Sequence, residues 1–340
     1  MQTTDFAKYL TKFFSEYLTG ERGASTNTIR SYSNTFTHLL TFMDEKEHIK
    51  ADTLLLDHLN RNVILRFLDW LQTSKQSGNA TRNQRLAALH SFFKYMQYED
   101  VKRMSQWQEI LSIKVKRQER RSVNYLTVDG VKFLLEQIPT DNRTARRNLA
   151  LIALMYDCGA RVQEIIDLSP SSLRIDKPSC ITLYGKGNKK RIVPLQDEQV
   201  ALLKEYMKEN SLDNPANNQR PLFANNRGGR LTNAGITYIL NMYADMARKL
   251  KPEIIPKISP HTLRHSKAMH LLQAGVNLVY IRDILGHVSI QTTEIYARAD
   301  SKQKRQALEA AYINVLPKTD NQGLWEKDAQ LKTWLKNLSK

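Results

Sequence analysis

Apolar residues recur at helical spacing through the first third of the chain. The first run begins at Phe6 and continues to Tyr17, and two glycines, Gly20 and Gly23, then interrupt it. The same periodicity returns several times before the pattern changes near residue 110. Helices are predicted over residues 6–17, 25–40, 53–59, 62–71 and 80–98. The pattern therefore predicts an all-helical domain over residues 1–110.

The pattern from residue 126 onward mixes two periods. Alternating apolar residues over 181–195 flank a Gly-Lys-Gly-Asn turn and predict a β-hairpin. Around the hairpin the spacing is helical, with Thr127 placed to cap the first helix. Helices are predicted over residues 127–137, 144–158, 231–250, 260–274 and 278–285, and around Tyr296. The predicted fold class is mainly α with a small β-sheet, and the second domain spans residues 126–318.

A basic segment separates the two predicted domains. Residues 111–125 show little apolar periodicity and carry five positive side chains, Lys114, Lys116, Arg117, Arg120 and Arg121. Such a linker can follow a DNA backbone from one domain to the next and turn the protein into a clamp. The alternative is a solvated linker that contacts nothing.

The charge of the chain favours a polyanionic partner. Among 340 residues, 51 are Lys or Arg and 34 are Asp or Glu, which gives a net charge of +17. Basic surfaces bind nucleic acid by releasing counterions. The rival partner is a membrane surface, but no apolar run approaches the roughly 20 residues that span a bilayer, and the N-terminus does not resemble a signal peptide. Cys158 and Cys180 lack metal-ligand spacing and are expected to be reduced packing residues of a cytoplasmic protein.

The stretch from residue 259 to 296 concentrates side chains that suit a phosphate. Ser259 and Pro260 form a helix start, so His261, Arg264 and His265 share a face near the positive end of the helix dipole. Further on, the sequence places His287 directly after the helix-ending Gly286, and Tyr296 nine residues later. A single histidine or tyrosine is usually a packing residue, and a single arginine is usually solvated. These histidines, the arginine and the tyrosine at this spacing together indicate a phosphate-binding function far more specifically than any one of them alone.

A second arginine follows a helix predicted to be buried. Arg161 comes just after Gly159, and Glu164 lies three residues later. A surface arginine is the ordinary reading, but a rigid helix with a glycine stop can hold a guanidinium in a fixed orientation. In the hairpin turn, Lys186 and Lys189 would ordinarily be exposed, and the GxxxxGK[ST] frame of a phosphate loop is absent.

These residue types together suggest a phosphoryl transfer. Arg161 and Arg264 can hold the nonbridging oxygens of a phosphodiester by bidentate contact. Tyr296 supplies a nucleophile whose ordinary pKa is about 10, so it needs positive charge and a proton acceptor, for which His261 is the first candidate. His287 would bond to the phosphoryl group. The motif regions lack a carboxylate cluster for two-metal catalysis, so no metal or other cofactor is expected.

These motifs resemble those of the tyrosine recombinase (phage integrase) family. The sequences HTLRH, LGH and the tyrosine resemble its C-terminal motif box, and GARVQEIIDL resembles its first arginine motif. STNTIRSY and NATRNQRLAALHSFFKY more loosely resemble its helical core-binding domain. The resemblance implies a mixed α/β catalytic domain, a covalent 3′-phosphotyrosine intermediate, and a hairpin lysine that protonates the leaving 5′-oxygen. Lys186 matches that lysine better than Lys189.

Other residues are expected to support the catalytic residues or to contact DNA. Glu164 and His265 are expected to support the catalytic residues, while Ala160 and Gln163 depart from the family pattern without removing a charge. Candidate DNA contacts outside the linker are Thr81, Arg82, Asn83, Arg85, Lys189, Arg227 and Arg230. A solvated role remains the alternative for each of them.

The last predictions concern the C-terminal tail and the biological role. Residues 319–340 have an amphipathic pattern, and the family resemblance implies a C-terminal segment exchanged between protomers, with a dimer on each core site and a tetramer at synapsis. The favoured role is integration or excision of a mobile element, with accessory directionality proteins as possible partners. The alternatives are a Xer-type dimer resolvase, a type IB topoisomerase-like enzyme and an inactive DNA-binding regulator.

Overall fold

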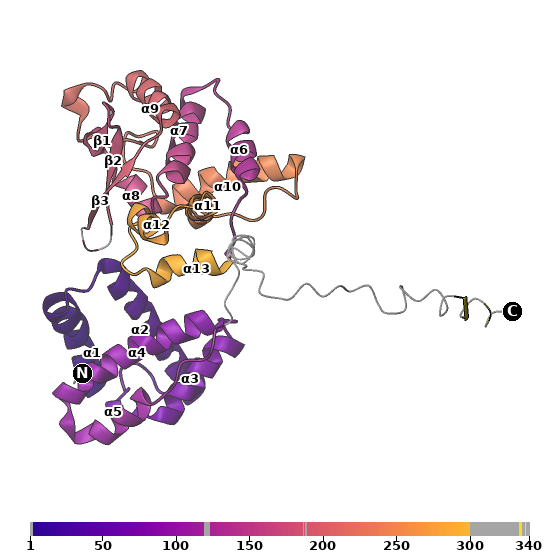
Figure 1. The fold of residues 1–340 in the computed structure, drawn as a ribbon. Helices are drawn as coiled ribbons and strands as arrows, with labels where there is room; N and C mark the ends of the chain where they lie inside the picture. Colours follow the sequence, from indigo (N-terminus) through magenta and orange to yellow (C-terminus); the bar gives the residue numbers. More distant parts are fainter. Residues whose placement is uncertain are drawn as a thin grey trace. The chain divides into compact units, whose positions relative to one another are not determined.

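The structure, a computed structural model, describes residues 3–118, 123–185, 187, 189–299, 333, 334 and 337. The chain forms two compact units, residues 1–121 and residues 122–340, and each is considered by itself. Both units are dominated by helices, and the second also contains a small antiparallel sheet (Figure 1). The predicted fold class, mainly α with a small sheet, is confirmed.

The first unit is built from helices alone in its described part. Its α-helices are α1 (Asp5–Lys12), α2 (Thr26–Glu47), α3 (Arg61–Thr73), α4 (Asn79–Glu99) and α5 (Met104–Leu111). A π-helix, η1 (Phe13–Glu21), continues α1, and short 3-10 turns cover Leu56–His58 and Val101–Arg103. The helical piece predicted over residues 53–59 is therefore a single turn. Helix α5 was not predicted.

Aromatic side chains fill the core of the first unit. Phe13 is fully buried and meets Phe36 and Phe92 edge to face, with ring centroids 6.3 and 5.3 Å away. Such contacts add to the area that the rings bury. On the other side, Trp107 from α5 stacks on Phe93 and donates its indole N–H to the carbonyl of Asp100 at 3.0 Å. This buried anchor explains why α5 forms despite its short apolar pattern.

The second unit carries the predicted hairpin within a larger helical assembly. The strands are β1 (Leu173–Arg174), β2 (Cys180–Tyr184) and β3 (Lys190–Pro194), all antiparallel in the order β1-β2-β3. The helices are α6 (Val128–Glu136), α7 (Arg143–Asp157), α8 (Val162–Ile166), α9 (Asp197–Glu209), α10 (Asn233–Leu250), α11 (Pro260–Gln273), α12 (Leu278–Leu285) and α13 (Gln291–Ala299), with 3-10 turns at Pro170–Ser172 and Pro215–Asn217. The hairpin prediction is confirmed, whereas β1 is too short to give a sequence signal.

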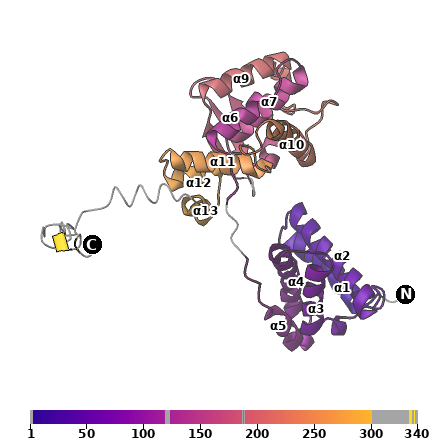
Figure 2. The same ribbon diagram turned by 90° about the vertical axis from the view of Figure 1, so that its right-hand side faces the viewer.

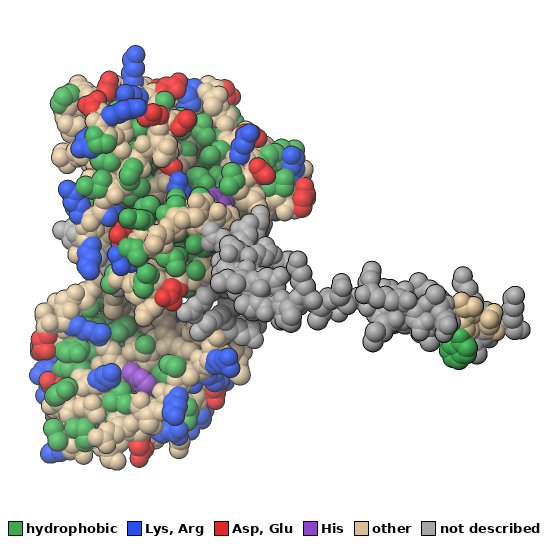
Figure 3. Space-filling model, viewed as in Figure 1, with side chains coloured by type: hydrophobic (Ala, Val, Ile, Leu, Met, Phe, Trp, Pro, Cys, Tyr) green, Lys and Arg blue, Asp and Glu red, His purple; other side chains and the backbone are tan. Residues whose placement is uncertain are grey.

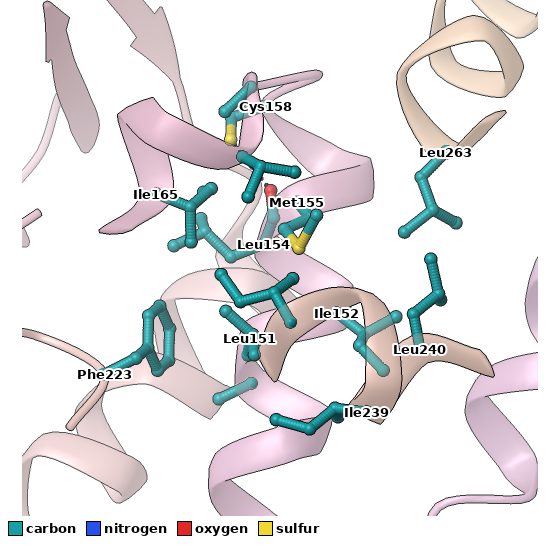
Figure 4. Close-up of a cluster of buried hydrophobic side chains, with 14 of the residues drawn as sticks. Leu151, Ile152, Leu154, Met155, Cys158, Ile165, Phe223, Ile239, Leu240 and Leu263 are labelled. Atoms are coloured by element: carbon teal, nitrogen blue, oxygen red, sulfur yellow. Dashed lines mark hydrogen bonds between the residues drawn. The ribbon is translucent and has the colours of Figure 1, made fainter. Parts of the chain in front are cut away.

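Helix α7 forms the centre of the core of the second unit. Residues along this helix, including Leu151, Ile152 and Leu154, are buried, and side chains such as Phe223 and Leu240 pack around them (Figure 4). Because α7 is enclosed on several sides, its end is fixed in space. That end leads directly into the segment from Gly159 to Arg161.

Helices α11, α12 and α13 pack against one another along one side of this unit (Figure 2). At the start of α11, the backbone N–H of Ser259 donates to the hydroxyl of Thr262 at 3.0 Å. Helix α12 has the predicted bounds and ends at Gly286, whose φ of 65° is readily adopted only by residues such as glycine. These helices carry the motif residues of the C-terminal stretch.

Candidate active site

Arg161 is held by a buried carboxylate at the start of α8. One of its terminal nitrogens, Nη1, donates to Glu164 Oε1 at 2.8 Å, and its backbone N–H donates to Oε2 at 2.7 Å. Nη2 reaches the carbonyl of Gly286 at 3.1 Å. The Arg161 side chain is 34% exposed, so its guanidinium is fixed by the protein and open on one side.

Arg191 binds the same carboxylate from β3. Its two terminal nitrogens each donate to Glu164 at 2.7 Å, and its Nε donates to the carbonyl of Ile284 at 2.9 Å. Burial alone would raise the pKa of Glu164, but hydrogen bonds and charge from Arg191, followed by Arg161, outweigh it and lower that pKa. Glu164 therefore stays ionised and supports two guanidinium groups at once.

Arg191 was not among the predicted site residues. The available signal was strand alternation: residues two apart share a face, and β3 turns Val193 inward while Ile192 is 57% exposed. That alternation places Arg191 on the inward face. Its partner is 27 residues earlier in the sequence, so only the fold brings the two together.

Arg264 is fixed from α11 by two backbone carbonyls. Nη1 donates to Gly159 at 2.6 Å and Nη2 donates to Leu285 at 2.5 Å. The residue is 4% exposed, and burial, followed by the charge of Arg161, lowers its pKa to about 10. Arg264 therefore remains charged near neutral pH, while the neighbouring Arg161 favours any anion that enters between them.

His287 follows the glycine that ends α12. Its Nδ1 lies 2.9 Å from the hydroxyl of Thr293, which is fully buried. Burial, followed by the charges of Arg264, Arg161 and Arg191, lowers the pKa of His287 to about 4. The imidazole is thus neutral at physiological pH and is oriented by Thr293.

Tyr296 lies inside this arrangement. Its side chain is 1% exposed and packs in an apolar cluster with Met269 and Leu285. The Tyr296 ring is nearly parallel to that of His287, with centroids 6.4 Å apart. Burial raises the pKa of Tyr296, and the charges of Arg264 and Arg161 act in the opposite direction. The structure thus brings the phenol to the two arginines and to His287.

The partner of the Tyr296 hydroxyl differs from the expected one. The hydroxyl lies 2.8 Å from Nδ1 of His265, whereas His261 was the first candidate for the proton acceptor. His261 is an exposed residue one turn earlier on α11, with its ring centroid 6.4 Å from that of His265. Partial desolvation, followed by the charges of Arg264 and Arg161, lowers the pKa of His261. The helical spacing alone could not tell which of the two histidines faces α13.

The predicted lysine, Lys186, lies outside the described residues. Its neighbour Gly185 is described, and a Cβ added there would lie 3.4 Å from Glu164 Oε1 and 3.7 Å from Arg161 Nη1. The base of the hairpin turn therefore adjoins the arginine cluster. Lys189 is exposed.

The polar entry to α4 is less exposed than a DNA-facing edge would be. Arg82 is 3% exposed, and burial lowers its pKa. Arg85 turns inward and donates to the carbonyl of Ser31 at 3.0 Å. Asn83 exchanges hydrogen bonds with the backbone of Lys116 at 2.8 and 3.0 Å, and Thr81 is half-buried. Arg82 is buried within the first unit and offers little surface to DNA, while Arg85 is half-buried; the DNA contacts of these residues stay a prediction.

Other predicted DNA contacts lie on the surface. Lys114, Lys116 and Arg117 are exposed, while Arg120 and Arg121 lie outside the described residues. Arg227 is exposed, and Arg230 is about half exposed and pairs with Asp167 at 2.6 Å. Lysine and arginine side chains are spread over both units on the face drawn in Figure 3, with acidic side chains among them.

The remaining expectations concern the C-terminal tail, the two cysteines, membrane spans and metal sites. Of the C-terminal tail, only residues 333, 334 and 337 are described, and Trp334 is 59% exposed. The two cysteines carry free thiols, and Cys158 is buried. Of the helices described, none combines the length and hydropathy that a membrane span requires. Across the same residues, no group of three His, Cys, Asp or Glu side chains could hold a metal ion.

Known proteins share this architecture. Residues 124–303 match the phage integrase family, and residues 11–100 match the N-terminal SAM-like domain of phage integrases. A Sinorhizobium fredii protein, y4rC, named as an integrase/recombinase, is 34% identical over 333 residues and 98% of each chain. The tyrosine recombinase XerD of Oceanobacillus iheyensis is 35% identical over 291 residues, covering 85% of this chain and 93% of the relative.

Solved structures agree with these matches. The XerH site-specific recombinase, bound to its palindromic difH substrate after cleavage, superposes with a TM-score of 0.66 at 25% identity, covering 85% of this chain and 81% of XerH. The Tn1549 transposon integrase shares the fold, with a TM-score of 0.67 at 18% identity, covering 88% of this chain and 98% of the integrase. The chain belongs to the phage integrase family of tyrosine recombinases, enzymes that cleave DNA strands and rejoin them.

Proposed function

We propose that this enzyme is a site-specific recombinase that cuts duplex DNA through a covalent 3′-phosphotyrosine intermediate formed by Tyr296. The observation that supports the proposal is that four side chains from different elements interact within the second unit. Tyr296 stacks beside His287 and is influenced electrostatically by Arg264 and Arg161. These groups come from α13, the loop after α12, α11 and the start of α8.

The arginines supply the electrostatic part of the mechanism. Cleavage of a phosphodiester develops charge on the phosphoryl oxygens in the transition state. Arg264 and Arg161 are held in place by backbone carbonyls and by Glu164, so little reorganisation is needed when the phosphate arrives. Preorganised donors of this kind contribute about 10²–10³-fold each in other enzymes.

The remaining residues orient the phosphate and move protons. His287, neutral and aligned by Thr293, hydrogen-bonds a phosphoryl oxygen, and the exposed His261 assists on the same side. Lys186 protonates the departing 5′-oxygen. Support for its role comes from Gly185, which lies beside Glu164 and Arg161. The phosphotyrosine bond preserves the energy of the cleaved bond, so a free 5′-hydroxyl can reverse the attack without ATP.

The resting structure keeps the nucleophile covered. With its side chain 1% exposed, Tyr296 can meet a phosphate only after the segments over it have shifted. An in-line attack needs the oxygen about 3–3.5 Å from phosphorus. We therefore assign the opening of this site to the DNA-bound state.

The DNA-bound assembly extends the proposal. The helical first unit and the exposed linker residues Lys114, Lys116 and Arg117 bind the duplex. A dimer forms on each core site and a tetramer forms at synapsis, with the C-terminal segment shared between protomers. XerH, which superposes on this chain, was solved on a DNA substrate, which supports a DNA partner. The enzyme would act in the cytoplasm, where its DNA lies.

The biological role proposed is integration or excision of a mobile element. The word integrase in the name of the y4rC relative supports this role. The rival is dimer resolution, the role suggested by the Xer relatives. Mapping where the enzyme joins DNA distinguishes the two: element ends support the first role, and a single chromosomal site supports the second.

A suicide-substrate experiment tests the chemistry. Nicked duplexes tiled across the DNA beside the gene would release a short strand after cleavage and trap the adduct, detected as a shift on a denaturing gel. Wild type is expected to form the adduct in the presence of EDTA, and Tyr296→Phe is expected to bind DNA without forming it. Tyr280→Phe, at a residue 65% exposed, is the matched control. Adduct formation by Tyr296→Phe would refute the proposal.

A further inference from the structure

The hydrogen bond between Tyr296 and His265 connects the proposed nucleophile to a basic nitrogen. The hydroxyl oxygen and Nδ1 are 2.8 Å apart, and the ring centroids are 5.7 Å apart. His265 directly follows Arg264 on α11, whose guanidinium is fixed by two carbonyls. The nitrogen therefore already contacts the phenolic hydroxyl, whose proton must leave when an oxygen–phosphorus bond forms.

The surroundings of the two groups keep both of them neutral near physiological pH. Burial, followed by the charges of His261 and Arg264, lowers the pKa of His265. Burial raises the pKa of Tyr296. A neutral imidazole accepts at one ring nitrogen and donates at the other. In the tautomer that carries the ring proton on Nε2, Nδ1 of His265 accepts the hydrogen bond from the Tyr296 hydroxyl, and this is the tautomer that the inference requires.

The other histidines near Tyr296 are engaged or oriented differently. His287 stacks on the Tyr296 ring, and its Nδ1 bonds to Thr293. His261 is exposed on the preceding turn of α11. Among the described side chains around the phenol, His265 is the one whose ring nitrogen lies at hydrogen-bond distance from the hydroxyl.

We infer that His265 is a catalytic residue that accepts the phenolic proton of Tyr296 as the phosphotyrosine bond forms and returns it when the strand is rejoined. The inference rests on the proposed function. In cleavage, the bond from Tyr296 Oη to phosphorus forms and the bond from phosphorus to O5′ breaks. The proton passes to Nδ1 of His265, and O5′ takes a proton from Lys186. Rejoining reverses each transfer.

Two substitutions separate proton transfer from mere positioning. His265→Asn places an amide near the position of Nδ1, where its oxygen can accept the hydrogen bond but cannot take the proton at neutral pH. His265→Ala removes the contact. Both variants are expected to slow single-turnover cleavage of the suicide duplex by about 10²–10⁴-fold, the usual contribution of a general base. Wild-type cleavage by folded His265→Asn would overturn the inference.

The chain supplies a closely matched control for these variants. His270 lies on the same helix, and its Nδ1 is 2.8 Å from the hydroxyl of Tyr156, a tyrosine outside the proposed chemistry. His270→Asn therefore makes the same change to the same kind of contact, and it also removes the contact of 2.9 Å between Nε2 and the carbonyl of Leu126. It is expected to keep cleavage within a few-fold of wild type. A loss as large as that of His265→Asn would show that the effect comes from disturbing α11 and would overturn the inference.

A sulfur-containing substrate shows on which side of the phosphorus His265 acts. Replacing the bridging 5′-oxygen by sulfur gives a leaving group of lower pKa that departs without protonation. This substrate is expected to restore cleavage by Lys186→Ala and to leave His265→Ala and His265→Asn slow. If sulfur restored the His265 variants, the histidine would belong to the leaving-group side, and the inference would be wrong.

The outcomes also separate this inference from the proposed function. If wild type formed no adduct on any duplex, both would fail. Suppose that wild type formed an adduct, that Tyr296→Phe did not, and that His265→Asn cleaved at the wild-type rate. The proposed recombinase chemistry would then be supported, and the proposed role of His265 would be wrong. Circular dichroism and DNA binding of each variant verify that it is folded.

Discussion

The guanidinium of Arg191 donates two hydrogen bonds of 2.7 Å to the carboxylate of Glu164. The same carboxylate accepts from Arg161, and Arg191 also reaches the carbonyl of Ile284 at the end of α12. A single ion cluster around the buried Glu164 carboxylate therefore links the hairpin, Arg161 and the helix before His287.

Removing Arg191 should destabilise the second unit strongly. Its side chain is 9% exposed and that of Glu164 is 3% exposed, and breaking a buried pair leaves an uncompensated charge that costs about 3–5 kcal/mol. We expect Arg191→Met to lower the free energy of unfolding by an amount at the lower end of that range, because Arg161 still contacts Glu164. Urea unfolding at pH 7 measures the loss.

The exposed pair between Arg230 and Asp167 is the matched control. Both side chains are about half exposed, and exposed pairs contribute about 0–1 kcal/mol. Arg230→Met should therefore change stability little. Equal losses in the two variants would show that the buried cluster is not the stabilising feature.

Gly159 is expected to tolerate no side chain. Its φ is 55°, and an added Cβ would lie 2.8 Å from Leu285 Cδ2. Gly228 has a similar φ of 78° with nothing within 4 Å, so Gly228→Ala should cost only the backbone strain, roughly 1–2 kcal/mol. Gly159→Ala should cost more and also slow cleavage, because the Gly159 carbonyl holds Arg264. Unfolding and cleavage rates of the two variants test this; matching values would contradict it.

The hydroxyl of Thr293 is expected to matter for cleavage. Thr293→Val removes the hydrogen bond that orients His287, and a net loss of about 1 kcal/mol corresponds to a rate reduction of about fivefold. The adjacent Thr292 is exposed, so Thr292→Val should cleave DNA at the wild-type rate. Single-turnover assays compare them, and an unaffected Thr293→Val enzyme would show that His287 does not depend on this contact.

His287 should make stability depend on pH in the acid range. Its pKa falls from 6.5 to about 4 on folding, so between these values the unfolded chain binds more protons than the folded one. Stability is therefore lost as pH falls through this window. His287→Asn should reduce the slope of unfolding free energy against pH between about 6.5 and 4, although other histidines with lowered pKa, such as His265, keep part of it. An unchanged slope would show that His287 titrates normally when folded.

The sequence alone predicted the parts of the structure that have local signals. Helix α12 has the predicted bounds, Thr127 caps α6, and the hairpin forms where apolar alternation flanks a glycine turn. Each of these follows from the residues of one short segment, whose caps, turns and period act locally.

The features that were missed depend on contacts between distant segments. Arg191 binds Glu164, which lies 27 residues earlier in the sequence. The hydroxyl of Tyr296 contacts His265, which lies 31 residues earlier. Arg82, at the polar start of α4, was a candidate DNA contact and is only 3% exposed. Periodicity shows that a residue lies on a helix face, but it does not show what packs against that face.

The covalent site on the protein tests the central claim most directly. After trapping with a suicide duplex in EDTA and digestion by nuclease and trypsin, the peptide from Asp283 to Arg298 contains a single tyrosine, Tyr296. Mass spectrometry should find this peptide carrying a nucleotide joined through its 3′-phosphate. A nucleotide attached to any other residue, or joined through a 5′-phosphate, would contradict the account.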